Sequence, residues 1–403
     1  MNRIFGLAFA AGVLCCGTAS AQVSDGVVKL GVLNDMSSLY ADIGGRGSVL
    51  AAQMAVEDFG GKVLGAPIEI VSGDHQNKPD IGAGFARKWI DTDRVDAIVD
   101  VPTSSVALAI QEVTREKKRL FLMSGPASSD LTGKACSPYG IQWTYDTYAL
   151  AHGTGGALVK QGGDSWFFIT ADYAFGHALE RDTGDAVKAA GGKVVGAVRA
   201  PLNTSDFSSF LLQAQASKAK VIGLANAGGD TINSIKQASE FGIVSSGQKL
   251  AGLLVFLTDV HSLGLKTAQG LTITSAWYWD KDDASRAFAK RFMARNPNGM
   301  PPTYTQAGVY TEVAQYLKAI QAAGTDDADK VVAQLRNMKI NDFMTKDGWL
   351  REDGRVMRDM YLEEVKSPTE SKYPFDYFKI LATIPADQAF RPLKDGGCPL
   401  VHG

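Results

Sequence analysis

The 403-residue sequence has little cysteine and no excess of charge of either sign. It contains 4 cysteines, 41 Lys and Arg residues against 43 Asp and Glu residues, and has a pI near 6.2. A near-neutral chain offers no basic field for a polyanion, which argues against nucleic-acid binding. Hydrophobic residues make up 45% and charged residues 21% of the chain, so it is not intrinsically disordered.

The common catalytic and cofactor motifs are also missing. The five histidines include no pair at the helical spacing of a zinc site, and there is no Cys-x-x-Cys. The sequence contains no Gly-x-Ser-x-Gly nucleophile elbow, no dinucleotide fingerprint after a strand and no Gly-Lys-Ser/Thr phosphate loop. We therefore expect no metal, no cofactor and no enzymatic activity.

A single long apolar run occurs, at the N-terminus. Arg3 is the only charge in the first 24 residues, and the run over residues 4–16 leads to small residues that end at Ala21. This pattern is typical of a cleaved signal peptide, here residues 1–21, and the run is shorter than the ~20 residues that a membrane span needs. We expect export to the periplasm. A lipoprotein attached at Cys15 is less favoured because the bulky Leu14 precedes it.

Cleavage would leave two cysteines, Cys136 and Cys398. In an oxidising compartment two such residues favour a disulfide, which would attach the C-terminal tail to the body of the protein. Two free buried thiols are the alternative.

The remaining sequence alternates between apolar strand patterns and amphipathic helix patterns. Examples are strands expected over 27–33, 97–101 and 250–256, a helix over 150–160 and a hairpin over 350–365. Strict alternation predicts parallel sheets with helices on both faces, and the pattern restarts after Tyr145. The fold class is therefore α/β, with two doubly wound units of similar size.

Several polar residues follow the expected strands directly. His75 ends one strand, Thr103 and Ser104 follow another, and Ser128 lies in the loop after a third. In open parallel sheets the loops at the carboxyl ends of strands form the ligand crevice, and hydroxyls with free N–H groups at a helix N-terminus suit a carboxylate. The alternative is that these hydroxyls only cap helices.

Aromatic and amide residues occupy other expected strand ends. A ring-lined cleft at this edge would suit an aromatic or bulky apolar ligand, although each ring taken alone is equally compatible with an ordinary core position. These residues are Tyr40, Tyr173, Phe175, Asn226, Phe256 and Tyr278.

Four segments carry a resemblance to a known family. They are residues 98–107, residues 122–132, the Asp-Tyr-Ala-Phe-Gly run over 172–176 and the Asn-Ala-Gly-Gly-Asp run over 226–230. With them, the mature chain resembles periplasmic substrate-binding proteins of ATP-driven (ABC) uptake systems, of the leucine/isoleucine/valine-binding type. Some of the relatives that it resembles bind aromatic acids.

The resemblance implies two lobes that close over a ligand, joined by three crossover segments near 142–145, 272–277 and 349–356. Lobe one would comprise residues 26–143 plus 277–345, lobe two residues 144–276 plus 346–385, and residues 386–403 would form a tail. The partner would be the membrane permease of an ABC transporter, and we expect a monomer.

The resemblance also assigns roles to residues. The hydroxyl that binds the ligand carboxylate falls on Thr103, a second carboxylate contact falls on Ser128 with Pro126 and Ala127, and Phe175 takes the place of a closing aromatic ring. The full set of ligand-binding residues that we predict is Tyr40, Ile43, His75, Thr103, Ser104, Pro126, Ala127, Ser128, Tyr173, Phe175, Asn226, Asp230, Phe256 and Tyr278.

One departure from the family bears on the ligand. Amino-acid binders place an acidic residue after the strand at 250–253 to pair with the ligand ammonium, and this chain has Leu254, Val255 and Phe256 there. A buried ammonium without a counter-charge is costly, so an aromatic or apolar carboxylate is favoured. Asp230 is the remaining candidate partner for an ammonium. The alternatives are a branched-chain amino acid as ligand, a secreted α/β hydrolase, and a ligand sensor for a signalling receptor.

Overall fold

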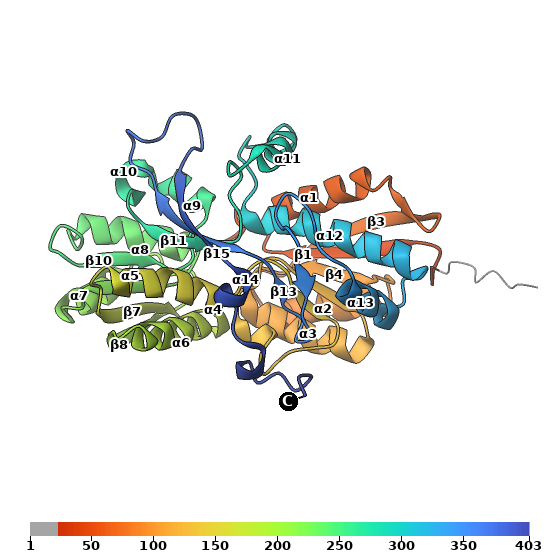
Figure 1. Ribbon diagram of the computed structural model, residues 1–403, viewed down its shortest axis with the longest axis horizontal. Helices are drawn as coiled ribbons and strands as arrows, with labels where there is room; N and C mark the ends of the chain where they lie inside the picture. Colours follow the sequence, from red (N-terminus) through yellow and green to blue (C-terminus); the bar gives the residue numbers. More distant parts are fainter. Residues whose placement is uncertain (1–22, 403) are drawn as a thin grey trace, which may run out of the picture.

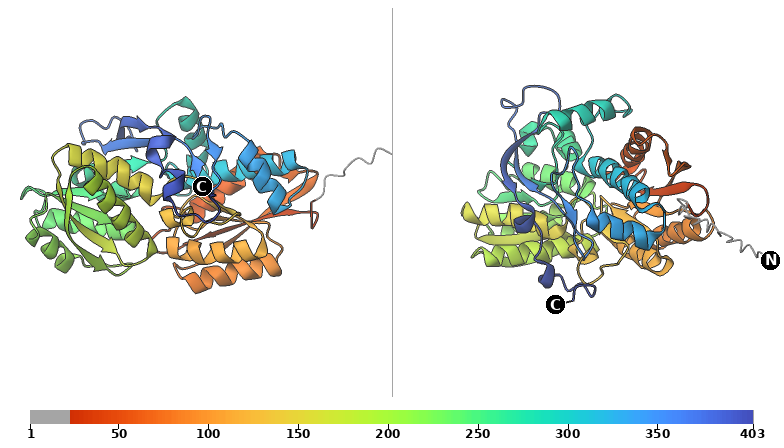
Figure 2. Two further views of the ribbon diagram at one scale, coloured as in Figure 1. Left: turned by 60° about the horizontal axis from the view of Figure 1, so that its bottom comes forward. Right: turned by 45° about the vertical axis from the view of Figure 1, so that its right-hand side comes forward.

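Two parallel sheets, one in each half of the molecule, organise the chain (Figure 1). The computed structural model describes residues 23–402, so the signal peptide expected over residues 1–21 lies outside the described residues. Figure 2 shows the two halves side by side from two further directions, with helices packed around each sheet.

The N-terminal sheet has six strands in the order β2-β3-β1-β4-β5-β6, and only β2 runs antiparallel to its neighbour. Alternate residues of its central strands belong to different cores: Val32 packs into one and Leu33 into the other. Both faces are therefore covered, as a parallel sheet requires. The strands are β1 (Val28–Asn34), β2 (Lys62–Val63), β3 (Ala66–Asp74), β4 (Ala97–Asp100), β5 (Leu120–Met123) and β6 (Gly140–Gln142).

Two groups of helices cover this sheet. Residues of α1 and α12 contribute to the first core, and residues of α2 and α3 to the second. We call the sheet with its helices lobe one. The helices are α1 (Gly45–Asp58), α2 (Pro79–Asp91), α3 (Ser104–Lys117), α11 (Asp283–Met293), α12 (Tyr304–Ala323) and α13 (Ala328–Asn337).

The second sheet has four parallel strands in the order β10-β9-β7-β8, and we call it, with its helices, lobe two. Central strand β7 is buried along its whole length, whereas edge strand β8 alternates between exposed and half-buried residues as far as Arg199. The strands are β7 (Ser165–Ala171), β8 (Lys193–Ala200), β9 (Val221–Ala225) and β10 (Lys249–Gly252). The helices are α4 (Thr147–Leu150), α5 (Gly156–Lys160), α6 (Ala174–Ala189), α7 (Ser208–Ala216), α8 (Gly229–Glu240), α9 (Leu257–Leu263) and α10 (Leu265–Ala268).

Two small antiparallel sheets complete the fold. One has the order β11-β14-β15 and the other is the hairpin β12-β13. Their strands are β11 (Thr272–Ser275), β12 (Trp349–Leu350), β13 (Val356–Met357), β14 (Met360–Val365) and β15 (Phe378–Ile384), followed by α14 (Ala386–Ala389).

Two fully buried arginines join the segments that pass between the lobes. Arg355 donates to the carbonyl of Tyr145 at 2.9 Å and lies 3.7 Å from the carboxylate of Asp146. Arg358 donates to the carbonyl of Ala276 at 3.1 Å. The chain near 355–358 is therefore fixed to the chain near both 145 and 276.

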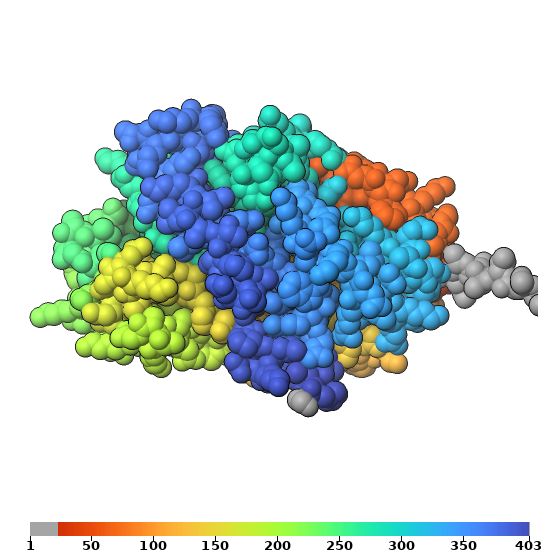
Figure 3. Space-filling model, viewed as in Figure 1, coloured from red at the N-terminus to blue at the C-terminus, as the bar shows by residue number. Residues whose placement is uncertain are grey.

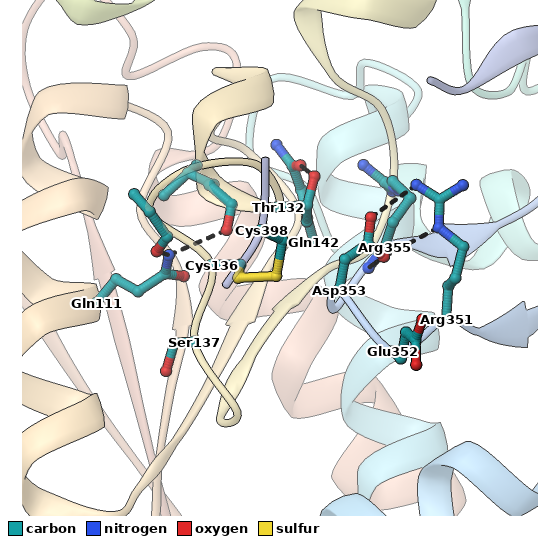
Figure 4. Close-up of a disulfide and its surroundings, with 12 residues drawn as sticks. Gln111, Thr132, Cys136, Ser137, Gln142, Arg351, Glu352, Asp353, Arg355 and Cys398 are labelled. Atoms are coloured by element: carbon teal, nitrogen blue, oxygen red, sulfur yellow. Dashed lines mark hydrogen bonds and ion pairs between the residues drawn. A yellow bond between two sulfur atoms is a disulfide. The ribbon is translucent and has the colours of Figure 1, made fainter. Parts of the chain in front are cut away.

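The C-terminal tail lies across the junction of the lobes, where Figure 3 shows the dark blue residues between the two halves. A disulfide between Cys136 and Cys398 holds it, with a Cα–Cα distance of 5.6 Å (Figure 4). The disulfide expected from the sequence is therefore present. Before it, Phe390 stacks on Arg355, whose guanidinium lies 4.5 Å from the ring centroid.

Three expected elements differ from the structure. The strand expected over 250–256 ends at Gly252, because its partner β9 ends at Ala225, and the following residues turn toward lobe one. The helix expected over 150–160 contains a π-helical stretch, Ala151–Gly155. The hairpin expected over 350–365 is confined to β12 and β13, since β14 pairs with β11 and β15 instead.

Candidate functional site

A narrow cavity lies between the two lobes. None of the ten side chains that line it is charged, and four of them are aromatic. The empty space between them is about 250 Å³, and it has room for only about one water-sized group. The lining residues are Tyr40, Ile43, Pro102, Gly125, Ala127, Tyr145, Phe175, Ala227, Leu254 and Phe256.

Most of these residues follow the carboxyl end of a strand. Lobe one contributes the loops after β1, β4 and β5, and lobe two contributes the segments after β7, β9 and β10. Tyr145 comes from the first crossover and donates to the carbonyl of Gly125 at 2.7 Å. The cavity therefore lies where the two parallel sheets face each other, the usual position of a ligand crevice in such folds.

The lobes are in direct contact at the mouth of the cavity. The hydroxyls of Tyr40 in lobe one and Tyr173 in lobe two are 2.6 Å apart. Gly228 has a φ of +57°, and a Cβ there would lie 2.7 Å from the carbonyl oxygen of Leu39. Because only glycine allows so close an approach, the structure represents a closed arrangement of the lobes.

Charged side chains connect the lobes outside the cavity. Asp182 of α6 accepts from the hydroxyl of Ser129 at 2.7 Å, and Arg181 lies 3.1 Å from the carboxylate of Asp130. Arg391 of the tail donates to Ser129 at 2.6 Å and lies 3.6 Å from Asp182. We call these five residues the charged rim.

Three long helices begin beside the cavity. Pro102 directly precedes the N-cap of α3, Phe175 lies in the first turn of α6, and Ala227 precedes the N-cap of α8. The N–H groups of a first helical turn have no acceptor within their helix, and the helix dipole makes this end attractive to an anion. The first turns of three helices therefore lie next to a lining that contains no positive side chain.

A family model described as periplasmic binding protein matches residues 27–371. The chain belongs to this family of periplasmic binding proteins. A periplasmic binding protein from Burkholderia mallei is 56% identical with a TM-score of 0.91, over 93% of this chain and 99% of that one. A branched chain amino acid ABC transporter periplasmic ligand-binding protein from Burkholderia xenovorans LB400 is 45% identical with a TM-score of 0.82, over the same shares of both chains.

A third similar structure is a solute binding protein of an ABC transporter from Rhodopseudomonas palustris HaA2 in complex with p-hydroxybenzoic acid. It is 25% identical with a TM-score of 0.80, and the match covers 89% of this chain and 97% of that one. The type I periplasmic binding protein fold expected from the sequence is confirmed by these matches.

In this periplasmic binding protein the predicted hydroxyls hold the loops beside the cavity. Thr103 is fully buried and donates to the side-chain oxygen of Asn77. Ser104 accepts from the N–H of Ser128 at 3.1 Å, and the hydroxyl of Ser128 accepts from the N–H of Asp130 at 3.3 Å. These bonds fix the loops after β4 and β5 to each other. Pro126 lies between the lining residues Gly125 and Ala127, and its carbonyl accepts from Gln142 at 3.0 Å.

His75 helps to fix the position of the same loops through Asn77. It is fully buried, its Nδ1 accepts from the N–H of Asn77 at 3.0 Å, and burial lowers its pKa to about 4. Nearby Asp35 accepts from the N–H of Tyr40 at 2.8 Å, and this and further hydrogen bonds lower the pKa of Asp35 despite its burial. A neutral histidine and an ionised aspartate therefore position Thr103, through Asn77, and the ring of Tyr40.

The backbone is strained where β4 meets the cavity. Asp100 and Val101 both have positive φ angles, +75° and +65°, directly before Pro102. The buried carboxylate of Asp100 accepts from Asn34 at 2.7 Å and from Ser48 at 2.5 Å, and burial raises its pKa to about 6. Two such residues in succession are rare, and the strain persists because this network fixes the turn.

The side chains of two predicted polar residues, Asn226 and Asp230, form hydrogen bonds within lobe two. The amide of Asn226 donates to Ser234 at 2.9 Å and accepts from Thr231 at 2.7 Å. Asp230 accepts from the N–H groups of Asn203 and Thr204, at 3.1 and 2.9 Å, and burial raises its pKa to about 6. Both side chains thus shape the start of α8.

Tyr278 lies away from the cavity, and its hydroxyl donates to the carbonyl of Phe375 at 3.0 Å. Five lining residues were not among the predicted set, although three of them neighbour predicted ones: Pro102, Gly125, Tyr145, Ala227 and Leu254. Pro102, Gly125 and Ala227 offer only backbone or small apolar surface, so their positions beside predicted residues were the one available signal.

Residues 23–402 contain neither a cluster of metal-ligating side chains nor a helix suited to span a membrane. Across residues 23–402 no group of three or more His, Cys, Asp or Glu residues is arranged to hold a metal ion. In the same residues no helix is both long enough and apolar enough to cross a membrane.

Proposed function

We propose that this protein captures a small organic carboxylate with an aromatic or apolar body between its lobes and delivers it to the membrane permease of an ABC transporter. The observation that carries the proposal is the interlobe cavity, which is lined by rings and aliphatic groups and has no charged side chain. Such a lining favours an apolar body and rejects a second charge on the ligand.

The ligand carboxylate would be held by backbone donors rather than by a cation. The first turn of α3 follows Pro102, and the loop at Ala127 is fixed to it through Ser104 and Ser128. Helix N-termini stabilise anions, and carboxylates accept several N–H bonds readily. Thr103 and Ser128 would contribute by orienting these donors, and the Ser128 hydroxyl, which accepts from the N–H of Asp130, would also donate to the carboxylate.

The division into lobes fits a capture mechanism. We assign residues 26–143 plus 277–345 to lobe one and 144–276 plus 346–385 to lobe two, with residues 386–403 as the tail. The ligand would enter an open form, and closure would bring Tyr173 to Tyr40 and Phe175 over the ligand. The cavity is narrow in the closed arrangement, so a ring-sized ligand would hold the lobes slightly farther apart.

A branched-chain amino acid is the second candidate ligand. It is favoured by the 45% identical relative, which is described as a branched chain amino acid ABC transporter ligand-binding protein. Against it stands the absence of a charged residue among the ten that line the cavity, since Asp230 is engaged with Asn203 and Thr204. An ammonium in this site would therefore lack a carboxylate partner.

The test is direct identification of the ligand. Protein purified from the periplasm without refolding is analysed by native mass spectrometry for a co-purified ligand. Calorimetry then compares benzoate-like and phenylpropenoate-like acids with leucine, isoleucine and valine. We expect tight binding of one class of aromatic acid and no turnover on prolonged incubation. Tight binding of leucine without response to the acids would assign the second candidate, and chemical conversion of a bound acid would overturn the transport role.

A further inference from the structure

A second cavity lies directly behind the first. Alternate residues of one segment face the two spaces: Leu254 and Phe256 line the interlobe cavity, whereas Val255 and Leu257 line the second one. Tyr304 also lines the second cavity and stacks on Phe256 with the ring centroids 4.6 Å apart. The gaps in the second cavity amount to about 280 Å³, with room for about one water-sized group.

A carboxylate without a partner faces this space. Glu363 of β14 is fully buried, and neither of its side-chain oxygens has a hydrogen-bond partner among the described residues. Ser275 and Tyr304 line the same cavity. The Tyr304 hydroxyl has no partner within residues 23–402, and the Ser275 hydroxyl lies beside Glu363 and lowers the pKa of its carboxyl against the effect of burial. Because Glu363 pairs with Ile273 in the sheet, Ser275 two residues further along β11 lies on the same face as Glu363. Four polar atoms therefore converge on a space of molecular size.

Most of the remaining lining residues are aromatic. Trp277, Tyr278, Trp279 and Phe378 line the cavity, and the polar atoms of the first three are bonded elsewhere. No lysine, arginine or histidine lines this cavity. Aromatic faces attract cations, and a buried carboxylate without a partner is one of the costliest groups a protein can hold. When Glu363 is ionised, a small positive charge satisfies this lining.

The geometry points to a binding site for a small monovalent cation, of the size of potassium or ammonium, held by Glu363, Ser275 and Tyr304 between these aromatic rings. A divalent ion is disfavoured because calcium and magnesium sites usually combine more oxygen ligands and charge than one carboxylate supplies. A larger organic cation exceeds the space.

Such a site would link the cation to closure of the lobes. Glu363 and Ser275 belong to the small β11-β14-β15 sheet, Tyr304 begins α12 of lobe one, and Val255 belongs to lobe two. The cation site formed by these residues is complete only when the lobes are closed. It would therefore favour the closed form and raise ligand affinity, since a ligand shifts an equilibrium by its preference for one state.

The cation should bind more tightly as the pH rises. Burial raises the pKa of Glu363 to about 8, from an ordinary value near 4.5, so folding favours the protonated carboxyl. Without a cation, this group's contribution to stability is present below about pH 4.5 and is lost as the pH rises toward 8. A cation offsets that loss. The other ionisable groups are Tyr278 and Tyr304, which burial keeps neutral, and Asp259 of α9, which acts on Tyr304 and whose pKa burial raises to about 7.

The experiment measures thermal unfolding of the full mature protein without organic ligand, at pH 6 and pH 8.5. Potassium, ammonium, sodium and choline chlorides are compared at equal ionic strength, with choline as the cation too large to enter. We expect a higher Tm, by roughly 2 °C or more, in potassium or ammonium than in choline, and a larger difference at pH 8.5. Equal melting temperatures in all four salts would overturn the cation site. They would indicate instead that the cavity holds a protonated Glu363 and a water molecule.

Two variants and a matched control locate the effect. Glu363→Gln keeps the shape but removes the charge, Tyr304→Phe removes one hydroxyl, and Glu364→Gln alters the adjacent residue, which pairs with Lys379 outside the cavity. We expect the cation effect to disappear in Glu363→Gln, to weaken in Tyr304→Phe and to persist in Glu364→Gln. An unchanged effect in Glu363→Gln would place the cation elsewhere. If that variant does not fold, the ammonium resonances of ¹⁵N-ammonium with wild-type protein serve instead: a slowly exchanging, protein-bound signal supports the site and its absence opposes it. None of these measurements uses the organic ligand, so they can fail or succeed independently of the proposed transport function.

Discussion

The centre and the edge of the interface between the lobes differ in chemistry. At the centre, the cavity is formed by rings, aliphatic groups and backbone, without charge. At the edge, the charged rim joins Ser129 and Asp130 of lobe one to Arg181 and Asp182 of lobe two, with Arg391 from the tail. The difference supports a division between two tasks: the rim fixes how the lobes meet, whereas under the proposed function the cavity would determine which molecule can lie between them.

The largest effect should come from removing the covalent anchor of the rim. Cys136→Ser with Cys398→Ser frees the tail that carries Arg391. Because the disulfide closes a loop with a sequence separation of 262, the free energy of unfolding should fall by up to ~5 kcal/mol. Urea unfolding measures this. The ratio of affinities for two ligands should not change, and an altered ratio would show that the rim also selects the ligand.

A substitution at the boundary of centre and edge should prevent closure. In Gly228→Ala the new Cβ would collide with the carbonyl oxygen of Leu39 in the other lobe. The alanine would also have to keep the unfavourable φ of +57°. Ligand affinity should fall by ~100-fold or more, about 3 kcal/mol, measured by calorimetry. Gly264→Ala is the matched control, because Gly264 also has a positive φ but nothing within 4 Å of a Cβ. Equal losses in both variants would mean that backbone strain, not contact between the lobes, is the cause.

Loss of a ring at the centre should weaken binding and alter selectivity. Phe175 is buried in the cavity, so Phe175→Ala should lower affinity by ~10- to 100-fold through lost apolar contact, about 1.5–3 kcal/mol. Affinity for an aromatic acid should fall more than affinity for a small aliphatic acid. Phe241→Ala, at a ring 40% exposed on lobe two, is the control. Unchanged affinity in Phe175→Ala would remove this ring from the site.

The smallest effect should come from one charge of the rim. Arg391→Gln removes the contacts to Ser129 and Asp182 but keeps the disulfide. Affinity for every ligand should fall by the same few-fold factor, about 1 kcal/mol, because only the closed form is weakened. Dissociation rates from stopped-flow fluorescence should rise to the same extent. A loss confined to one ligand would contradict the division between centre and edge.

The sequence predicts the fold well because apolar periodicity and strand-helix alternation are local properties. Val32 and Leu33 are consecutive apolar residues of one strand and therefore point to opposite faces of the first sheet. Their order in the sequence is enough to predict that both faces are covered. The error at 250–256 has a non-local cause: the residues after Gly252 are as apolar as a buried strand, but no partner strand extends beside them. They are buried against the other lobe instead.

The site is harder to predict because capping and ligand contact use the same side chains. Tyr40, Ile43, Ala127, Phe175 and Phe256 line the cavity, and their role in binding stays a prediction. Asn226 has the same strand-end position in the sequence, yet its amide is hydrogen-bonded to Thr231 and Ser234 of α8. Nothing local distinguishes the two outcomes, since the direction of each side chain is fixed by tertiary neighbours. Glu363 gives no sequence signal at all, because in the sequence it cannot be told from its half-buried neighbour Glu364.

The disulfide of the tail also has a mechanical consequence. The chain passes between the lobes in three segments, and the bond from Cys398 to Cys136 adds a fourth covalent connection. The reach of this connection depends on the length of the short stretch between α14 and Cys398. The angle through which the lobes can swing apart therefore has an upper limit that depends on redox state. Reduction would remove this limit and widen the open form, whereas the closed cavity between the lobes would keep its lining.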